Sequence, residues 1–173
     1  MRTLRLSLAG TVILALLGGL AGAVVAQSED VRSAVWLTFT EQDCVVGDHE
    51  PATIVDGVEQ LRGMPRTCEL TSADSRVSGV QNNIINHDCF DSGICISWGT
   101  QEVVGPDGTW SGWFNGTIDP DGNGHGHVVL TGSGGYEGLV NVRHALGPVD
   151  AIPTQYGVVY EADTPPIVAL PTE

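Results

Sequence analysis

The chain contains no lysine, and its seven basic residues are outnumbered by 21 acidic ones. The formal net charge of −14 would repel a phosphate backbone, which argues against nucleic-acid binding. Charged residues make up only 16% of the sequence and glycines number 23, so the composition is not that of a charged disordered tract. After the first 26 residues, no stretch sustains helical periodicity over three turns. These absences point to an acidic, folded protein built almost entirely of β-strands.

Catalytic signatures are also missing. The sequence has no Gly-x-Ser-x-Gly elbow, no His-Glu-x-x-His helix, no phosphate-binding glycine loop and no Cys-x-x-Cys pair. No pair of carboxylates stands out as a general acid and base. We therefore predict no catalytic residues, and the sequence favours a protein that is not an enzyme.

The first 26 residues have the features of a signal peptide. Arg2 and Arg5 precede an apolar run over 6–20, and Val24 and Ala26 occupy the −3 and −1 positions of a cleavage site. An uncleaved membrane anchor is the alternative, because the apolar run is nearly long enough to span a bilayer. The cleavage site favours a secreted or extracytoplasmic protein, in the periplasm or cell envelope, with no stable membrane anchor.

The remainder predicts one domain flanked by two tails. Residues 27–32 form a short N-terminal tail, residues 33–161 a β-domain, and residues 162–173 a proline-rich C-terminal tail. Both tails are expected to be mobile.

Four cysteines, Cys44, Cys68, Cys89 and Cys95, all follow the predicted signal peptide. An even number of cysteines in an exported protein indicates two disulfides, for which three pairings exist. We favour Cys44–Cys68 and Cys89–Cys95, because each pair would close its own local loop. A zinc site is the competing interpretation, but the spacing and the oxidising compartment argue against it.

Short runs with a two-residue period predict the strands. In 33–40 and 110–118, apolar residues alternate with polar ones, and turn dipeptides such as Asp56-Gly57 and tripeptides such as Pro120-Asp121-Gly122 separate the runs. Glycines recur inside the strands, and such glycines mark the bends of a tightly curved sheet. These are Gly112, Gly116, Gly126 and Gly132. The pattern predicts a small antiparallel β-barrel of about eight strands, with a β-sandwich as the alternative.

The segment 130–139, Leu-Thr-Gly-Ser-Gly-Gly-Tyr-Glu-Gly-Leu, resembles the glycine-rich signature of allene oxide cyclase-like and dirigent-like barrels. Three earlier segments, 74–79, 98–100 and 107–113, occur in an order that resembles that of uncharacterised secreted bacterial proteins with such a barrel. The resemblance covers about residues 33–160 and implies an eight-stranded barrel with a hydrophobic interior. No catalytic residue of the plant cyclases matches a position of this chain, so the resemblance does not imply cyclase activity.

Two segments could bind a metal. Asp119, Asp121 and Asn123 fit the first half of a calcium loop, but the position that should supply a bidentate glutamate is Leu130. A hairpin turn explains this segment better, and a calcium ion is the only cofactor that the sequence leaves open. His125 and His127 would point to one side of a strand, yet no third ligand is nominated by spacing.

Candidate ligand-binding residues come from the aromatic side chains and from one acid and one base in the same segment. They are Trp98, Trp110, Tyr136, Glu137 and Arg143. We expect a secreted, non-catalytic barrel that binds a small apolar ligand or an envelope partner. An isomerase-like or cyclase-like enzyme with a hydrophobic substrate in its lumen is one alternative, and a structural extracellular module is another. The sequence is also compatible with a homo-oligomer.

Overall fold

The computed structural model describes residues 35–148 and 154–162, so the predicted signal peptide and nearly all of both tails lie outside the described residues. In this part, strands predominate, and the one helical element is a single 3₁₀ turn, η2 (Ser75–Val77). No helix there has the length and apolarity that crossing a membrane requires. The strands are β1 (Val35–Val46), β2 (Thr53–Val55), β3 (Val58–Ser72), β4 (Gly79–Cys89), β5 (Cys95–Val104), β6 (Gly108–Ile118), β7 (Asn123–Gly134), β8 (Leu139–Pro148) and β9 (Thr154–Glu161).

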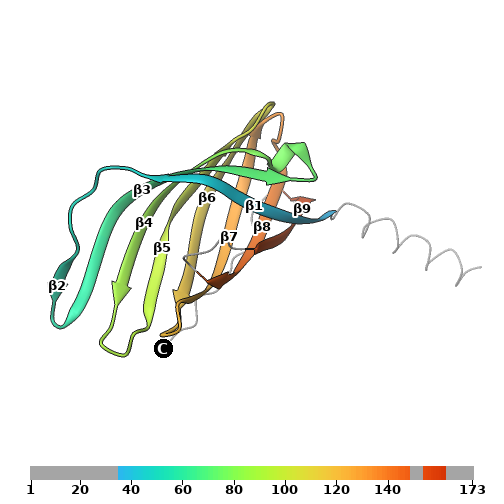
Figure 1. Cartoon of the computed structure of the whole chain (residues 1–173). Coiled ribbons are helices and arrows are strands. Elements are labelled where there is room, and N and C mark those ends of the chain that lie inside the picture. Colours follow the sequence, from blue (N-terminus) through green and yellow to red (C-terminus); the bar gives the residue numbers. More distant parts are fainter. Residues whose placement is uncertain (1–34, 149–153, 163–173) are drawn as a thin grey trace, which may run out of the picture. The chain divides into compact units, whose positions relative to one another are not determined.

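The nine strands form one antiparallel sheet in the order β1-β9-β8-β7-β6-β5-β4-β3-β2. The sheet also pairs β1 with the later part of β3, which closes eight strands into a ring (Figure 1). β2 pairs with the first residues of β3 as an additional hairpin strand beyond this closure. The prediction of an all-β barrel of about eight strands is therefore confirmed.

Strict alternation decides which side chains face the interior of this ring. Trp110 and Phe114 on β6 point inward, opposite Val128 and Leu130 on β7 and the glycines between them. The intervening residue Ser111 is exposed. The two-residue period of the sequence therefore grouped the side chains that share a face of β6 correctly, and the structure shows which of the two faces is the inner one.

Glycines inside the strands allow close approach of neighbouring backbones. A Cβ atom at Gly112 would overlap the carbonyl oxygen of Val129, and one at Gly99 would overlap that of Ile84. Gly126 differs, because a Cβ atom there would be 3.4 Å from the nearest atom, the Asn115 carbonyl oxygen. A side chain is therefore sterically forbidden at Gly99 and Gly112, where the neighbouring backbones approach closely.

Apolar side chains fill one end of the barrel, which we call the closed end. Trp110 stacks on Tyr136 with ring centroids 5.1 Å apart, and both side chains are fully buried. The Trp110 Nε1 donates a hydrogen bond of 2.7 Å to the Arg76 carbonyl oxygen, which fixes η2 over this end. Val77 and Val103 complete the packing. The hydrophobic core thus occupies only part of the lumen.

Both disulfides have the predicted pairing, Cys44–Cys68 and Cys89–Cys95. The first joins β1 to β3 at the seam where the ring closes, and the second joins β4 to β5 at directly opposed positions. No free cysteine lies in the described residues. Two disulfides indicate folding in an oxidising environment.

Candidate functional site

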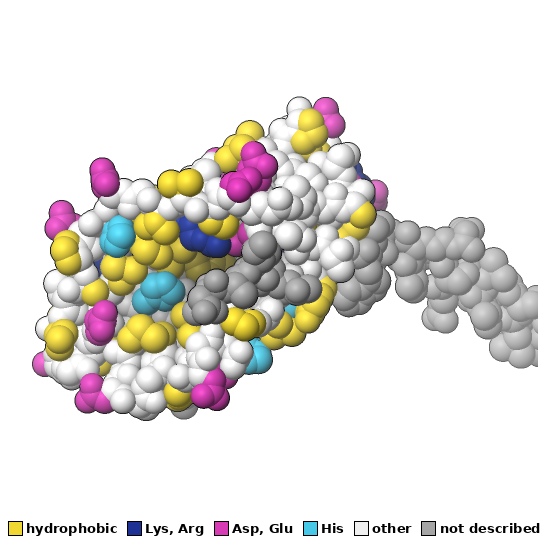
Figure 2. Space-filling model, viewed as in Figure 1, with side chains coloured by type: hydrophobic (Ala, Val, Ile, Leu, Met, Phe, Trp, Pro, Cys, Tyr) yellow, Lys and Arg dark blue, Asp and Glu magenta, His cyan; other side chains and the backbone are white. Residues whose placement is uncertain are grey.

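The part of the lumen that the core does not fill is a cavity of about 420 Å³. It lies between the core and the end of the barrel that carries the β6–β7 turn, which we call the open end. Figure 2 shows this hollow, lined mainly by hydrophobic side chains, with a basic group inside it. Ligand pockets in proteins commonly have volumes of about 300–1,000 Å³, so the cavity is large enough for a small molecule.

Apolar side chains from several strands line the cavity. They are Val46, Met64, Ile85, Phe114, Ile118, Val128 and Ala145. Four glycines, Gly116, Gly124, Gly126 and Gly147, leave room between them because they place no side chain in the lumen. The cavity therefore exists because glycines replace the larger inward-facing residues that fill the closed end.

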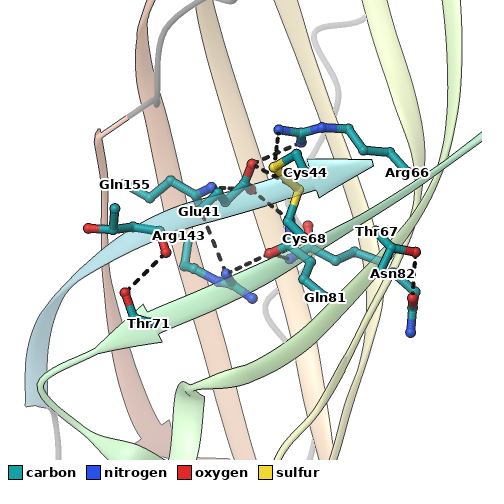
Figure 3. Close-up of a disulfide and its surroundings, with 12 residues drawn as sticks. Glu41, Cys44, Arg66, Thr67, Cys68, Thr71, Gln81, Asn82, Arg143 and Gln155 are labelled. Atoms are coloured by element: carbon teal, nitrogen blue, oxygen red, sulfur yellow. Dashed lines mark hydrogen bonds and ion pairs between the residues drawn. A yellow bond between two sulfur atoms is a disulfide. The ribbon is translucent and has the colours of Figure 1, made fainter. Parts of the chain in front are cut away.

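Between the core and the cavity lies a set of polar side chains, all buried except the partly exposed Arg66, which we call the polar layer. Its members come from six strands and are Glu41, Arg66, Gln81, Asn83, Gln101, Arg143 and Gln155. Figure 3 shows most of them beside the Cys44–Cys68 disulfide. Glu41, Arg66, Asn83, Gln101 and Gln155 also line the cavity, so the polar layer is its floor.

Glu41 is the acceptor at the centre of the polar layer. Its Oε1 accepts hydrogen bonds of 2.6 Å from both Gln81 Nε2 and Gln155 Nε2. Its Oε2 forms a 2.8 Å ion pair with Arg66 Nη1. Gln101 extends the network by donating to Gln81 Oε1 over 2.8 Å. Both oxygens of this buried carboxylate are thus engaged, as a charge in a low-dielectric interior requires.

Arg143 lies fully buried under the two glutamines. Its Nη1 is 3.5 Å from Gln81 Oε1 and from Gln155 Oε1, and its Cζ lies 4.8 Å from the Phe39 ring centroid. Nε and Nη2 have no hydrogen-bond partner among the described residues. Burial lowers the pKa of Arg143 to about 10, although the charge of Glu41 opposes this shift. The guanidinium is still protonated at neutral pH.

Two polar groups that line the cavity also lack a partner within the described part of the chain. Asn83 is 6% exposed and its Oδ1 makes no hydrogen bond, and the same holds for Nδ1 of His87. Burial lowers the pKa of His87, which favours its neutral form. Buried polar atoms without partners are costly, so a ligand that satisfies them would gain free energy from doing so.

The polar layer carries an excess of positive charge. Arg66 and Arg143 contribute two positive charges and Glu41 one negative charge, which leaves a net charge of +1 in the layer. This sign is opposite to that of the whole chain, whose formal net charge is −14. The floor of the cavity therefore attracts a ligand group that is anionic or accepts hydrogen bonds.

None of the five predicted ligand-binding residues lines the cavity, although Arg143 lies directly beneath its floor. Trp98 packs on the outside of the barrel under the Arg62 guanidinium, 4.9 Å from the ring centroid. Trp110 and Tyr136 belong to the closed-end core. Glu137 is exposed in the β7–β8 loop, whereas Arg143 is buried beneath the floor, so this acid and base are not brought together.

The predicted calcium segment forms the turn between β6 and β7. Asp119 Oδ1 accepts hydrogen bonds from the backbone N–H groups of Asp121 at 3.0 Å and Asn123 at 2.8 Å. These bonds lower the pKa of Asp119, with the Asn123 backbone as the largest cause. This geometry is that of a hairpin turn closed by an aspartate side chain. Calcium binding at Asp119, Asp121 and Asn123 stays a prediction.

One cluster of three potential metal ligands occurs in the described residues, formed by Glu41, Cys44 and Cys68. The two sulfur atoms are joined in a disulfide, so they are not available as thiolate ligands. This grouping therefore does not constitute a zinc site in the oxidised protein.

Of the polar layer, only Arg143 was predicted from the sequence. A signal was present, because Glu41 follows Leu37 and Phe39 at two-residue intervals and so shares their inward face. Gln81 and Asn83 lie in a strand, β4, that the turn signals did not delimit. The two-residue alternation along β1 could have predicted that the Glu41 carboxylate faces the lumen. The residues that bind this carboxylate come close to it only when the strands close into a ring.

Comparisons with family models, curated proteins and solved structures found no match to this chain. The resemblance to allene oxide cyclase-like and dirigent-like barrels thus stays a prediction.

Proposed function

We propose that the protein is an exported, non-catalytic barrel that binds a small amphipathic molecule in its lumen. The observation that carries this proposal is the cavity of about 420 Å³, with apolar walls and a buried polar floor. Such a site, mostly hydrophobic with a few convergent polar groups, is typical of small-molecule binding. The structural-module hypothesis predicts a solid core, which the half-empty lumen does not favour.

The polarity of the site suggests how the ligand lies. Its apolar body contacts the walls formed by residues such as Met64, Ile85 and Phe114. Its polar end reaches the floor, where Arg66 and Asn83 offer donors and the layer has an excess positive charge. An anionic amphiphile is therefore expected to bind more tightly than a neutral one of the same size.

An enzyme is the second candidate, favoured by one observation: His87 lines the cavity with an unpartnered Nδ1. A neutral imidazole in an apolar lumen could accept a proton from a substrate. Glu41 is a poor candidate base because three donors already occupy its carboxylate. We rank binding first, since an acid–base pair converging on one point is not present among the described lumen residues.

The test is titration of the purified protein with two fluorescent probes, anionic anilinonaphthalene sulfonate and neutral phenylnaphthylamine. We expect saturable fluorescence with both, and tighter binding of the anionic probe. The Gly126→Leu variant should abolish binding, because its side chain enters the lumen where a Cβ atom meets nothing closer than 3.4 Å. Ser111→Leu on the adjacent strand is the matched control, since it adds the same side chain to the exposed face.

Unchanged probe binding in a folded Gly126→Leu variant would place the probes outside the lumen and contradict the proposal. Circular dichroism and a thermal melt establish that each variant is folded. Turnover of a bound compound that is lost in His87→Gln, while probe binding persists, would favour the enzyme instead.

A further inference from the structure

Two histidines face each other on the outside of the barrel. His127 on β7 and His144 on β8 occupy directly opposed positions, and their ring centroids are 4.2 Å apart with an interplanar angle of 65°. Both side chains are exposed. Neither ring makes a hydrogen bond to another described residue, so their nitrogen atoms are free to bind a ligand.

The spacing suits chelation of one metal ion. Imidazole nitrogen lies about 2.0–2.1 Å from a bound transition metal, so two nitrogens on one ion are separated by about 4 Å at most. Rings whose centroids are 4.2 Å apart meet this condition after small side-chain rotations. The backbone pairing of β7 with β8 fixes the two Cα positions, so the pair loses little conformational freedom on binding.

Neighbouring strands extend the same outer row. Asn115 pairs with His127 from β6, and Tyr156 pairs with His144 from β9. Their side chains can supply weak oxygen donors beside the two imidazoles. The formal net charge of −14 adds a general attraction for cations.

We propose that His127 and His144 form a surface site for a divalent transition metal, and that copper(II) is the ion bound most tightly. Two imidazoles supply the protein donors, and water occupies the other coordination positions. Imidazole favours copper and zinc over the hard cations calcium and magnesium, and copper stands highest in the order of divalent affinities. His127 also borders the cavity, but its neighbour Val128 packs into the core, so the His127 imidazole is on the opposite, outer face of β7.

Sequence spacing alone nominated a different pair, His125 and His127. These two side chains lie on one strand, and His125 is opposed by Thr117 on β6 and Leu146 on β8. No second imidazole therefore lies directly across from His125. The cross-strand partner His144, 17 positions further along the chain, becomes apparent only from the register.

The test is titration of the untagged, oxidised protein with copper(II) chloride, followed by calorimetry and electron paramagnetic resonance. We expect one tight site per chain, with a spectrum that shows nitrogen ligation. His127→Gln and His144→Gln should each weaken binding at least about tenfold, as the loss of a metal-site group does. His125→Gln and His49→Gln are matched controls that should bind as the unaltered protein does.

Equal copper affinity in His127→Gln and the unaltered protein would overturn the proposal. A spectrum showing oxygen ligation alone would do the same, because it would assign the ion to the acidic surface. A loss of affinity in His125→Gln equal to that in His144→Gln would replace this site with one that His125 shares. Both histidines are exposed, so the variants are expected to keep the fold, which a thermal melt verifies.

Discussion

Glu41 on β1 and Arg143 on β8 are opposite charges buried in the same layer, and Gln155 joins them. The Gln155 amide nitrogen donates a 2.6 Å hydrogen bond to Glu41, and its amide oxygen lies 3.5 Å from Arg143 Nη1. Gln81 makes the same two contacts from the other side of the lumen. The polar layer is thus a network in which the side-chain amides of Gln81 and Gln155 each contact both Glu41 and Arg143, and its stability depends on every member.

The first prediction concerns Glu41. Glu41→Gln leaves Arg143 buried without a counter-charge, removes the ion pair with the partly exposed Arg66, and is expected to lower the free energy of unfolding by about 3–5 kcal/mol. Urea unfolding followed by tryptophan fluorescence measures this loss. Arg143→Gln added to Glu41→Gln should cost about 0.5–3 kcal/mol less than the sum of the single changes, because one buried charge compensates the other. Strict additivity would show that the two residues are not coupled.

The second prediction concerns glycines on the inner face. Gly112→Ala should lower the free energy of unfolding by about 1–3 kcal/mol, because the new Cβ atom overlaps the Val129 carbonyl oxygen and pushes β6 from β7. Gly126→Ala should leave it unchanged or raise it by up to about 1 kcal/mol, since space is available and the unfolded chain loses freedom. Thermal unfolding of the two variants and of the unaltered protein measures both changes in stability. Equal losses would contradict the difference in packing.

The third prediction separates the two disulfides. Replacing Cys44 and Cys68 by serine removes a link with a sequence separation of 24, whereas the Cys89–Cys95 link has a separation of 6. The chain-entropy model gives losses of about 3.5 and about 2.4 kcal/mol respectively. Denaturant unfolding of the two double variants should therefore rank the Cys44–Cys68 link as the more stabilising. The reverse order would show that native contacts, not loop length, dominate.

The fourth prediction is a pH dependence due to His87. Burial lowers its pKa, so the unfolded chain takes up the proton at a higher pH than the folded protein does. The free energy of unfolding should consequently fall as the pH drops from about 7 through the ordinary value near 6.5, and level off below the folded-state pKa. His87→Gln removes this contribution, so its curve between about pH 7 and pH 5 should be shallower.

The comparison in the His87 experiment is between two proteins that share every other titrating group. Burial also lowers the pKa of His144, with His127 as a further cause, and this contributes the same sign in both proteins. Only the difference between the two curves reports on His87. Parallel curves would mean that His87 is solvated in the folded protein.

The sequence by itself indicated most of the strands and the residues that share one face of β6, and it favoured the cysteine pairing that the structure shows. These features depend on local patterns: alternation with a two-residue period, turn residues at fixed places, and cysteines that flank short loops. The tertiary structure decided the site. Glu41, Arg66, Arg143 and Gln155 lie far apart in the chain, and ring closure and register place them in one layer. The aromatic residues that the sequence suggested as pocket walls lie elsewhere: Trp110 and Tyr136 fill the closed end, and Trp98 lies on the outer face. Whether an inward-facing side chain belongs to the core or to the cavity depends on its position along the barrel axis, which the sequence pattern does not give.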